Sequence, residues 1–348
     1  MRKMKINIAV ILTLTLLYIA CKPDPSFDPE VIVEEDITFK VPDGWPAPFY
    51  NFENNTLTNA GFYLGRKLFY DTRLSRDNST SCGSCHQSFA AFAHSDHAIS
   101  HGVDGLLGTR NSPPIFNMNW HTSFFWDGGV NHLESQPINP IQNPVEMDET
   151  LPNIIAKIEA DEKYRQMFAA AWGDEKVTSQ RIFKSMAQFM GVIVSDNSKY
   201  DQYTRGEVGL TTSEQSGLKV FNDKCASCHT APLFTDFSFR NNGLKPSSVN
   251  DSGRMRITQL PADMYTFKMP TLRNLKYTAP YMHDGRFKTL DQVLDHYTSG
   301  IFVSPTLDPL LQNGISLSTQ ERADMLSFLN TLNDEVLVRD QRFQEVLE

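Results

Sequence analysis

Two copies of one five-residue motif carry the clearest chemical signal in the sequence. CGSCH at residues 82–86 and CASCH at residues 225–229 both follow the Cys-x-x-Cys-His pattern of covalent c-type haem attachment. Two thiols one helical turn apart can bond to the two vinyl groups of a haem, and the next imidazole then reaches the iron. Zinc would need further thiols or paired histidines, and only Cys21 remains outside the motifs. We therefore expect two c-type haems, rather than zinc or a thioredoxin-like redox pair, attached through Cys82, Cys85, Cys225 and Cys228 and ligated by His86 and His229.

The elements that position these motifs appear twice in the same order. An apolar periodic segment at residues 59–70 leads into the first motif, and a second such segment at residues 213–221 leads into the second motif. The offset between Cys82 and Cys225 is 143 residues, which indicates a duplication. We expect a helix in each segment, with capping boxes formed by Thr212 with Gln215 before the second motif and by Ser318 with Glu321 near the C-terminus.

The region between the motifs divides into loops and helices. Residues 90–144 are dense in Gly, Pro, Asn and His without clear periodicity, which predicts long loops over the first haem. Apolar residues at helical spacing follow and predict core-facing helices: Ile154, Ile155 and Ile158, and then Ile182, Met186, Phe189 and Ile193. The fold class expected is mainly α, with two cytochrome c-like haem domains at residues 51–205 and 206–340.

The N-terminus has the pattern of an export signal. Arg2, Lys3 and Lys5 precede an apolar run that ends at Cys21 and is too short to span a membrane. We expect a lipoprotein signal peptide at residues 1–20 and lipid attachment at Cys21. The Pro-rich and acidic residues that follow predict a tether at residues 21–50. The protein is then an exported, membrane-anchored lipoprotein that faces the periplasm.

The charge balance bears on the partners. Loss of the signal peptide leaves 29 basic residues against 41 acidic ones, a net charge of −12. Nucleic acid is therefore not an expected partner. An acidic surface can steer a basic redox protein such as a small cytochrome c, although it also serves plain solubility.

A longer series of motifs resembles one known family. LGRKLFYDTRLS, GTRNSPP, FFWDGG, PIQNPVEM and MPTLRNLKYTAPYMHDG occur in consistent order around the two haem motifs, from about residue 59 to residue 332. This series resembles the bacterial di-haem cytochrome c peroxidases and their MauG relatives. The resemblance implies a peroxide-reducing enzyme with an N-terminal peroxidatic haem, a C-terminal electron-transfer haem and a small cytochrome c as electron donor. It also makes a homodimer an expectation, because dimers are common among relatives.

The resemblance also assigns roles to residues outside the haem motifs. Gln136 and Glu146 match the distal groups of the first haem, where a carboxylate can move a proton between the two peroxide oxygens. Without the resemblance, Glu146 would be an ordinary loop carboxylate. Trp126 matches a tryptophan between the haems, with aromatic core packing as the alternative role. A calcium site is implied by Asn111 together with the backbone carbonyls of Thr278 and Pro280.

The sequence departs from the peroxidase pattern at the second axial ligand of the second haem. Peroxidases of the family usually have a methionine fourteen residues after the histidine of the YxHxG motif, here His283, but this chain has Tyr297, as in MauG. The sequence predicts a short helix over residues 289–299, closed by Gly300, with Tyr297 on its apolar face. His296, on a more polar face, and Met264, Met269 and Met282 remain alternative ligands. A phenolate stabilises ferric iron and lowers the potential, whereas a thioether raises it.

Two functional questions stay open at this point. His101 lies near the position where some peroxidases of the family have a histidine that blocks the first iron until the second haem is reduced. The tyrosine at position 297 favours a MauG-like oxidase, which acts on a protein or small-molecule substrate, as the alternative to a peroxidase. A third reading is an electron-carrier cytochrome, in which both irons are permanently six-coordinate and Glu146 has no catalytic use.

Overall fold

Helices form most of the regular structure in the computed structural model, which describes residues 36–95 and 97–346. The expected signal peptide, the lipid-attachment residue Cys21 and the first part of the tether lie outside the described residues. Within the described part, no helix is long and apolar enough to cross a bilayer. Two short strands, β1 (Phe239–Arg240) and β2 (Phe267–Lys268), pair antiparallel. The α-helices are α2 (Asn59–Tyr70), α3 (Cys82–Cys85), α4 (Ile138–Gln142), α5 (Leu151–Glu159), α6 (Glu162–Trp172), α7 (Ser179–Gly191), α8 (Lys199–Thr204), α9 (Thr212–Lys224), α10 (Met255–Thr258), α11 (Leu290–Ser299) and α12 (Thr319–Asn330).

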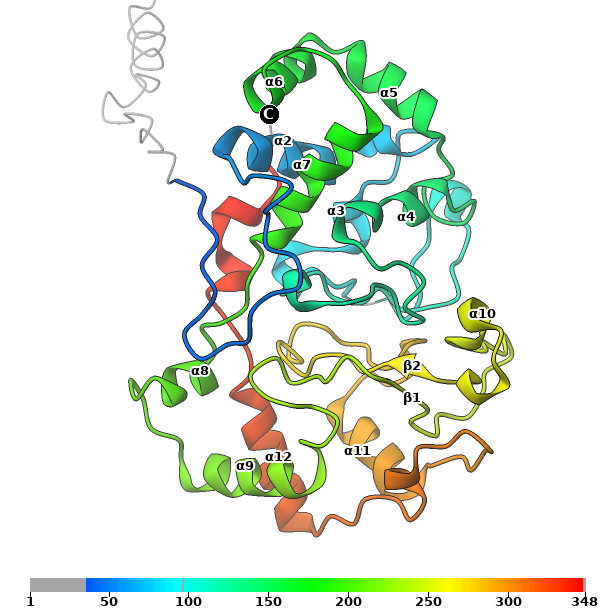
Figure 1. Ribbon diagram of the computed structural model, residues 1–348. Helices are drawn as coiled ribbons and strands as arrows, with labels where there is room; N and C mark the ends of the chain where they lie inside the picture. Colours follow the sequence, from blue (N-terminus) through cyan, green and yellow to red (C-terminus); the bar gives the residue numbers. More distant parts are fainter. Residues whose placement is uncertain (1–35, 96, 347–348) are drawn as a thin grey trace, which may run out of the picture. The chain divides into compact units, whose positions relative to one another are not determined.

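The first core forms around α2 and α7, which cross closely (Figure 1). Thr58 begins α2 by accepting a hydrogen bond from the Gly61 backbone N–H, as an N-cap residue does. Gly65 lies against α7, where a Cβ would come within 1.9 Å of the Ser185 carbonyl oxygen. Only glycine permits this approach, so the helix before the first haem motif can pack directly on the backbone of α7. The predicted helix over residues 59–70 is confirmed.

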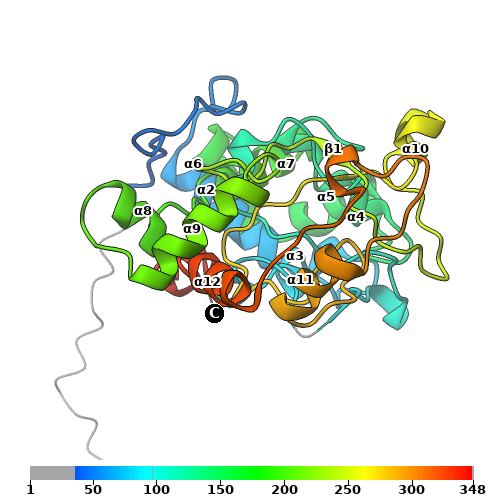
Figure 2. The same cartoon turned by 90° about the horizontal axis from the view of Figure 1, so that it is seen from below.

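The second core repeats this arrangement with α9 and α12, which lie side by side in both ribbon views (Figures 1 and 2). Gly217 of α9 lies against α12, where a Cβ would come within 1.9 Å of the Asp324 carbonyl oxygen. The predicted helix over residues 213–221 is confirmed, because these residues lie within α9. In both halves, therefore, a glycine before the haem motif allows close packing of two helices.

The capping box of α9 differs from the expectation by one residue. Thr211 and Glu214 form it, not Thr212 and Gln215. Glu214 accepts a hydrogen bond from the Thr211 backbone N–H at 2.7 Å and also pairs with Lys199 at 2.7 Å, an interaction that the neutral Gln215 could not provide. The predicted capping box of Ser318 and Glu321 is confirmed at the start of α12.

Between α3 and α5, long loops predominate, as the sequence predicts. Residues 90–144 contain α4 and short 3-10 turns. The helices expected from the apolar spacing that follows are confirmed as α5 and α7, although Ile193 lies just beyond the end of α7. The 3-10 turns of the described chain are Thr72–Leu74, Ser88–Ala90, Val103–Gly105, Met118–Trp120, Leu133–Ser135, Pro261–Asp263, Pro309–Leu311, Leu337–Arg339 and Gln341–Phe343.

Residues 37–50, which we call the strap, fall within the expected tether and pack on the folded body. The Ile37 backbone N–H donates to the Asn59 side chain at 2.8 Å, and the Tyr50 backbone N–H donates to the Asn119 carbonyl at 2.9 Å. In Figure 1 the strap, in dark blue, descends from the level of α2 toward α8 and returns. At the other end of the chain, Phe343 packs against the first core. From residue 37 to residue 346, the described residues thus form one compact unit with two hydrophobic cores.

Candidate haem centres and active site

The first haem motif forms α3, a single turn that places both thiols and the histidine at one site. The His86 backbone N–H donates to the Cys82 carbonyl at 2.9 Å. The His86 side chain uses Nδ1 for a hydrogen bond to the Phe92 carbonyl at 2.9 Å. A carbonyl only accepts, so Nδ1 carries the proton and Nε2 keeps its lone pair. Burial lowers the pKa of His86 to about 4, which leaves a neutral imidazole ready to bind a metal.

The second motif has the same arrangement. His229 donates from Nδ1 to the Phe234 carbonyl at 3.2 Å, and burial lowers the pKa of His229 to about 4. A hydrogen bond of this kind fixes the tautomer and the ring orientation of a metal-binding histidine and makes the ligating nitrogen more basic. Both motifs therefore hold a histidine whose Nε2 is prepared for axial ligation of a haem iron.

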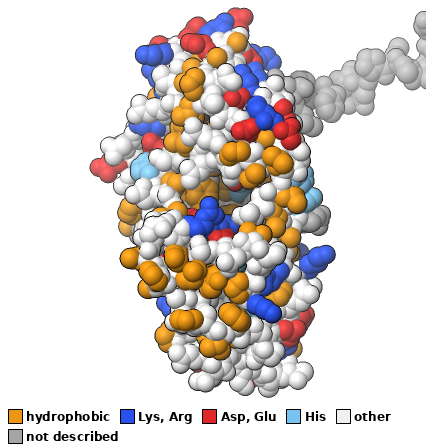
Figure 3. All heavy atoms as spheres, turned by 90° about the vertical axis from the view of Figure 1, so that its right-hand side faces the viewer, with side chains coloured by type: hydrophobic (Ala, Val, Ile, Leu, Met, Phe, Trp, Pro, Cys, Tyr) orange, Lys and Arg blue, Asp and Glu red, His pale blue; other side chains and the backbone are white. Residues whose placement is uncertain are grey.

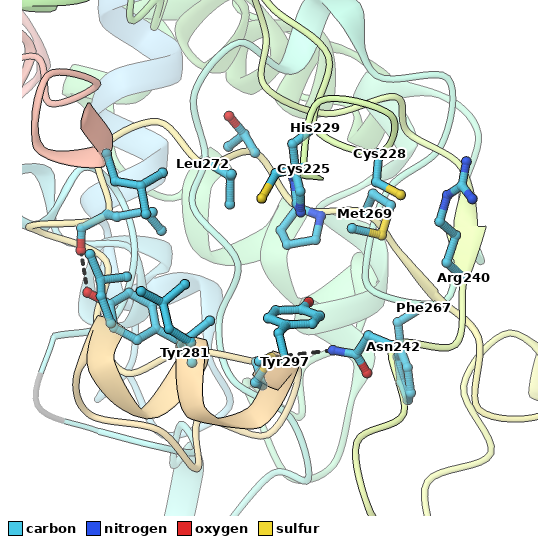
Figure 4. A pocket seen from close by; sticks show the side chains of 18 of the residues that line it. Cys225, Cys228, His229, Arg240, Asn242, Phe267, Met269, Leu272, Tyr281 and Tyr297 are labelled. Atoms are coloured by element: carbon cyan, nitrogen blue, oxygen red, sulfur yellow. Dashed lines mark hydrogen bonds between the residues drawn. The ribbon is translucent and has the colours of Figure 1, made fainter. Parts of the chain in front are cut away.

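An apolar cavity lies in front of the second motif. Cys225, Cys228 and His229 line one side of it, and Tyr297 of α11 faces His229 from the other side (Figure 4). The apolar side chains suit a flat porphyrin ring, and the three basic side chains suit its carboxylates. The apolar lining includes Phe221, Leu272, Leu275, Leu294, Met325 and Leu329, and the basic residues are Lys224, Arg240 and Lys268.

The helix that carries Tyr297 is the one that the sequence predicts. Thr289 and Gln292 form the capping box of α11, and Gly300 is its C-cap. Burial raises the pKa of Tyr297 to about 12, although a hydrogen bond with Asn242 opposes this shift. Tyr297 thus has the position expected of a second axial ligand, and its ligation of the iron stays a prediction.

The residues that could replace Tyr297 as ligand of the second haem differ in their positions relative to the cavity. His296, expected on a more polar face of α11, is buried, with only 4% of its surface exposed. His296 lies 5.8 Å from Phe287 between ring centres and donates from Nε2 to the Asn242 carbonyl at 3.0 Å, which gives it a packing role. Met269 and Met282 line the cavity, whereas Met264 does not.

Glu146 lies close to the first haem motif. Its carboxylate accepts a hydrogen bond from the Asn143 side chain at 2.7 Å, and burial raises the pKa of Glu146. Burial raises the pKa of the Cys82 thiol to about 12, with smaller contributions from the nearby charges of Cys85 and Glu146. Glu146 therefore lies close enough to both thiols for their charges to interact. Gln136, with 8% of its surface exposed, precedes α4 in the same segment.

The loop that contains His101 packs on the main chain of Glu146. The Val103 backbone N–H donates to the Glu146 carbonyl at 2.8 Å. The His101 side chain is exposed, and its ring centre lies 5.2 Å from that of His97. His101 is thus near the first site, and its binding to the iron stays a prediction.

Trp126 belongs to the first half of the chain but lines the cavity of the second site. Its indole N–H donates to the Asn111 carbonyl at 2.8 Å. Asn111 also connects the halves, because its backbone N–H donates to the His283 carbonyl at 2.7 Å and its side chain donates to the Ala98 carbonyl at 3.1 Å. Trp126 is therefore held at the junction between the loops of the first site and the cavity of the second.

Comparison with known proteins identifies the family. A family model for di-haem cytochrome c peroxidases matches residues 59–209. The methylamine utilization protein MauG of Methylophilus methylotrophus is 33% identical over 300 residues, which cover 85% of this chain and 88% of the relative. Cytochrome c551 peroxidase of Nitrosomonas europaea is 36% identical over 239 residues, 67% of this chain and 71% of the relative. The chain belongs to the di-haem cytochrome c peroxidase and MauG family. The resemblance inferred from the motifs is confirmed.

A solved structure agrees with this assignment. The crystal structure of a MauG-like protein associated with microbial copper homeostasis is 34% identical and superposes with a TM-score of 0.81 over 88% of this chain and 99% of that chain. The family is defined by two c-type haems, and the two motifs with their apolar surroundings fit that requirement. The chain is accordingly a di-haem oxidoreductase of the cytochrome c peroxidase type.

Lys268 is a residue of the di-haem site that the sequence analysis missed. Its backbone N–H donates to the Trp126 carbonyl at 2.8 Å, and its ammonium group donates to the Ser123 carbonyl at 2.6 Å and contacts His121 at 3.1 Å. Burial lowers the pKa of Lys268 to about 7. A lysine within the apolar segment FKMP was the available signal, because buried lysines usually have a specific partner.

Proposed function

We propose that the protein reduces hydrogen peroxide to water with electrons from a small c-type cytochrome or a similar donor. The observation that carries the proposal is the half-buried carboxylate of Glu146 beside the first haem motif, in a chain of the peroxidase family. The reaction consumes two electrons and two protons per peroxide and yields two waters. When bound, the first haem supplies the iron at which the O–O bond is cleaved.

The protein residues would manage the protons. Glu146 accepts a proton from the peroxide oxygen nearer the iron and returns it to the departing oxygen, a transfer that a pKa raised toward neutrality favours. The Asn143 side chain orients the carboxylate through the 2.7 Å hydrogen bond. Gln136 acts as a second polar group that positions the peroxide. His101 remains a candidate ligand that delays peroxide binding until its loop moves.

The second site would relay electrons. His229 and Tyr297 are the proposed axial ligands, and Trp126 is the proposed link toward the first site. Asn111, Thr278 and Pro280 all line the same cavity, which supports a calcium site at this junction. Among the described residues, no cluster of three or more His, Cys, Asp or Glu side chains could hold a metal, so calcium would rely on amide and backbone oxygens.

The remaining proposals concern location and partners. Export to the periplasm, with a lipid anchor at Cys21, follows from the N-terminal sequence. Figure 3 shows apolar side chains around a hollow in one face, with charged side chains of both signs near it. A mixed apolar and charged surface suits the transient docking of a small redox protein. The domain limits at residues 51–205 and 206–340 and a homodimeric assembly stay predictions.

A MauG-like oxidase is the second candidate function. Tyr297 in the cavity wall favours it, because a phenolate ligand makes the second haem a weak electron acceptor and a better store of oxidising equivalents. The protein would then oxidise a protein or small-molecule substrate instead of a cytochrome.

One assay separates the two functions. Purified protein is mixed with peroxide and reduced cytochrome c, and cytochrome oxidation is followed optically. A peroxidase oxidises two cytochromes per peroxide, and Glu146→Gln should lower that rate by about 10²- to 10⁴-fold. Glu159→Gln, at an exposed position of α5, is the matched control and should leave the rate unchanged. Cytochrome that stays reduced while peroxide changes the haem spectrum would favour the oxidase, and an unchanged rate in Glu146→Gln would refute the proton-transfer role.

A further inference from the structure

Arg273 is a buried cation that joins α8 to the loop after the second haem motif. None of its surface is exposed, and it forms a bidentate ion pair with Asp201 of α8 at 2.7 and 2.8 Å. It also donates from Nε and Nη2 to the Pro232 carbonyl, at 2.9 and 2.7 Å. A planar guanidinium with this many partners fixes their relative positions much more strictly than a single contact would.

The segment around Arg273 supports the loop that follows the second haem motif. Three consecutive carbonyls of that loop receive hydrogen bonds from three consecutive residues. Arg273 donates to Pro232, the Thr271 hydroxyl donates to Leu233 at 2.6 Å, and the Leu272 backbone N–H donates to Phe234 at 3.2 Å. The Phe234 carbonyl is also the acceptor for His229 Nδ1. The position of this loop therefore sets the direction of the hydrogen bond that orients the His229 ring.

Trp45 of the strap covers the guanidinium. The Arg273 guanidinium carbon lies 4.8 Å from the centre of the Trp45 ring and 5.5 Å from that of Phe234. Trp45 is itself held edge-on against Trp120 of the first half at 5.0 Å, and Trp120 donates to the Pro46 carbonyl at 2.8 Å. The strap thus places an aromatic ring from the N-terminal segment on the cation that supports the second haem loop.

We propose that Trp45 is a positioning residue for the second haem, because it shields Arg273 and thereby fixes the loop that orients His229. An aromatic face stabilises a guanidinium and keeps water from it. Without the ring, water would compete for the Arg273 donors, and the loop would gain freedom. The hydrogen bond from His229 Nδ1 would weaken, the imidazole would become a poorer donor to the iron, and ferric iron would be less stabilised. The inference rests on the proposed ligation by His229 and not on peroxide turnover.

The test is a spectroelectrochemical titration of the full-length protein with both haems attached. Trp45→Ala should raise the reduction potential of the second haem and change the electron paramagnetic resonance signal of its ferric form. The potential of the first haem should stay at its wild-type value and serves as the internal reference. Trp45→Phe keeps an aromatic face and should restore the wild-type potential. Phe49→Ala is the matched control, because Phe49 lies on the same strap with 63% of its surface exposed.

Two results would overturn the inference. The first is that the second haem of Trp45→Ala keeps the wild-type reduction potential and the wild-type electron paramagnetic resonance signal. The second is that the potentials of both haems shift equally, which would indicate a general loss of structure. Should Trp45→Ala fail to fold, Trp45→Leu keeps apolar volume without an aromatic face and is judged by the same two criteria. The reduction potential can be measured without turnover. A protein that holds two haems but has no peroxidase activity would refute the proposed function, and the role of Trp45 could still be tested in it.

Discussion

Gly102 lies directly against the main chain of Glu146, where a Cβ at position 102 would come within 2.0 Å of the Glu146 carbonyl oxygen. The neighbouring hydrogen bond from Val103 to the same carbonyl holds the two segments together. The loop with His101 and the candidate proton-transfer residue therefore share one close backbone contact, and we expect a change in that loop to displace Glu146.

Substitution of Gly102 tests this contact. Gly102→Ala places a methyl group against backbone that has no room for it, and overpacking of this kind typically costs about 1–3 kcal/mol. We expect the unfolding free energy to fall by that amount and peroxide turnover to fall with it, because Glu146 is displaced. Gly209→Ala is the control, since a Cβ there meets nothing within 4 Å. Wild-type turnover in Gly102→Ala would show that the contact does not position Glu146.

Glu146 should make activity and stability respond to pH in opposite ways. Burial raises the pKa of Glu146, so the folded protein favours the protonated carboxyl. The stability from this preference is complete below about pH 4.3, the ordinary glutamate value, and is lost as the pH rises through the raised value. Activity needs the ionised form and should therefore decline as the pH falls through that same value.

Thermal unfolding of Glu146→Gln checks the stability half of this prediction. The glutamine cannot ionise, so the variant does not lose the stability that wild type loses as the pH rises. The melting temperature of the variant minus that of wild type should therefore increase from acid to alkaline pH, even though the variant has lost turnover. A variant that becomes progressively less stable than wild type toward alkaline pH would contradict the prediction.

Tyr297 should control the spectrum and potential of the second haem. Tyr297→Phe removes the hydroxyl that faces His229 across the cavity. We expect the ferric spectrum of that haem to change and its potential to rise, because the proposed phenolate ligand is lost. Tyr281→Phe is the control in the same cavity, where the hydroxyl donates to the Leu275 carbonyl at 2.8 Å. Wild-type spectra in Tyr297→Phe would transfer the ligand role to Met269 or Met282.

The two close helix crossings predict matching losses of stability. Gly65→Ala and Gly217→Ala each place a Cβ within 1.9 Å of a backbone carbonyl of the partner helix. Each substitution should lower the unfolding free energy by about 1–3 kcal/mol, measured by denaturant titration. Gly209→Ala again serves as the reference for an unhindered glycine. Stability equal to wild type in either variant would mean that the helices separate without cost.

Local signals in the sequence specify the covalent chemistry and the helices beside it. The motifs at residues 82–86 and 225–229 specify haem attachment because their chemistry depends on spacing along the chain. The helices α2, α9 and α11 were predictable for the same reason, since caps and apolar periodicity are local signals. The capping box of α9 was misplaced by one residue because Lys199, distant in sequence, favours Glu214.

The residues that meet across the chain are known from the folded structure alone. His296 became a packing residue because Asn242, more than fifty positions earlier, offers a carbonyl to its ring. Lys268 binds the carbonyl of Ser123, which belongs to the first half of the chain. Trp45 contacts Trp120 in the first half and Arg273 in the second half. Such contacts depend on how two cores and the strap are brought together, and no periodicity or local spacing records that arrangement.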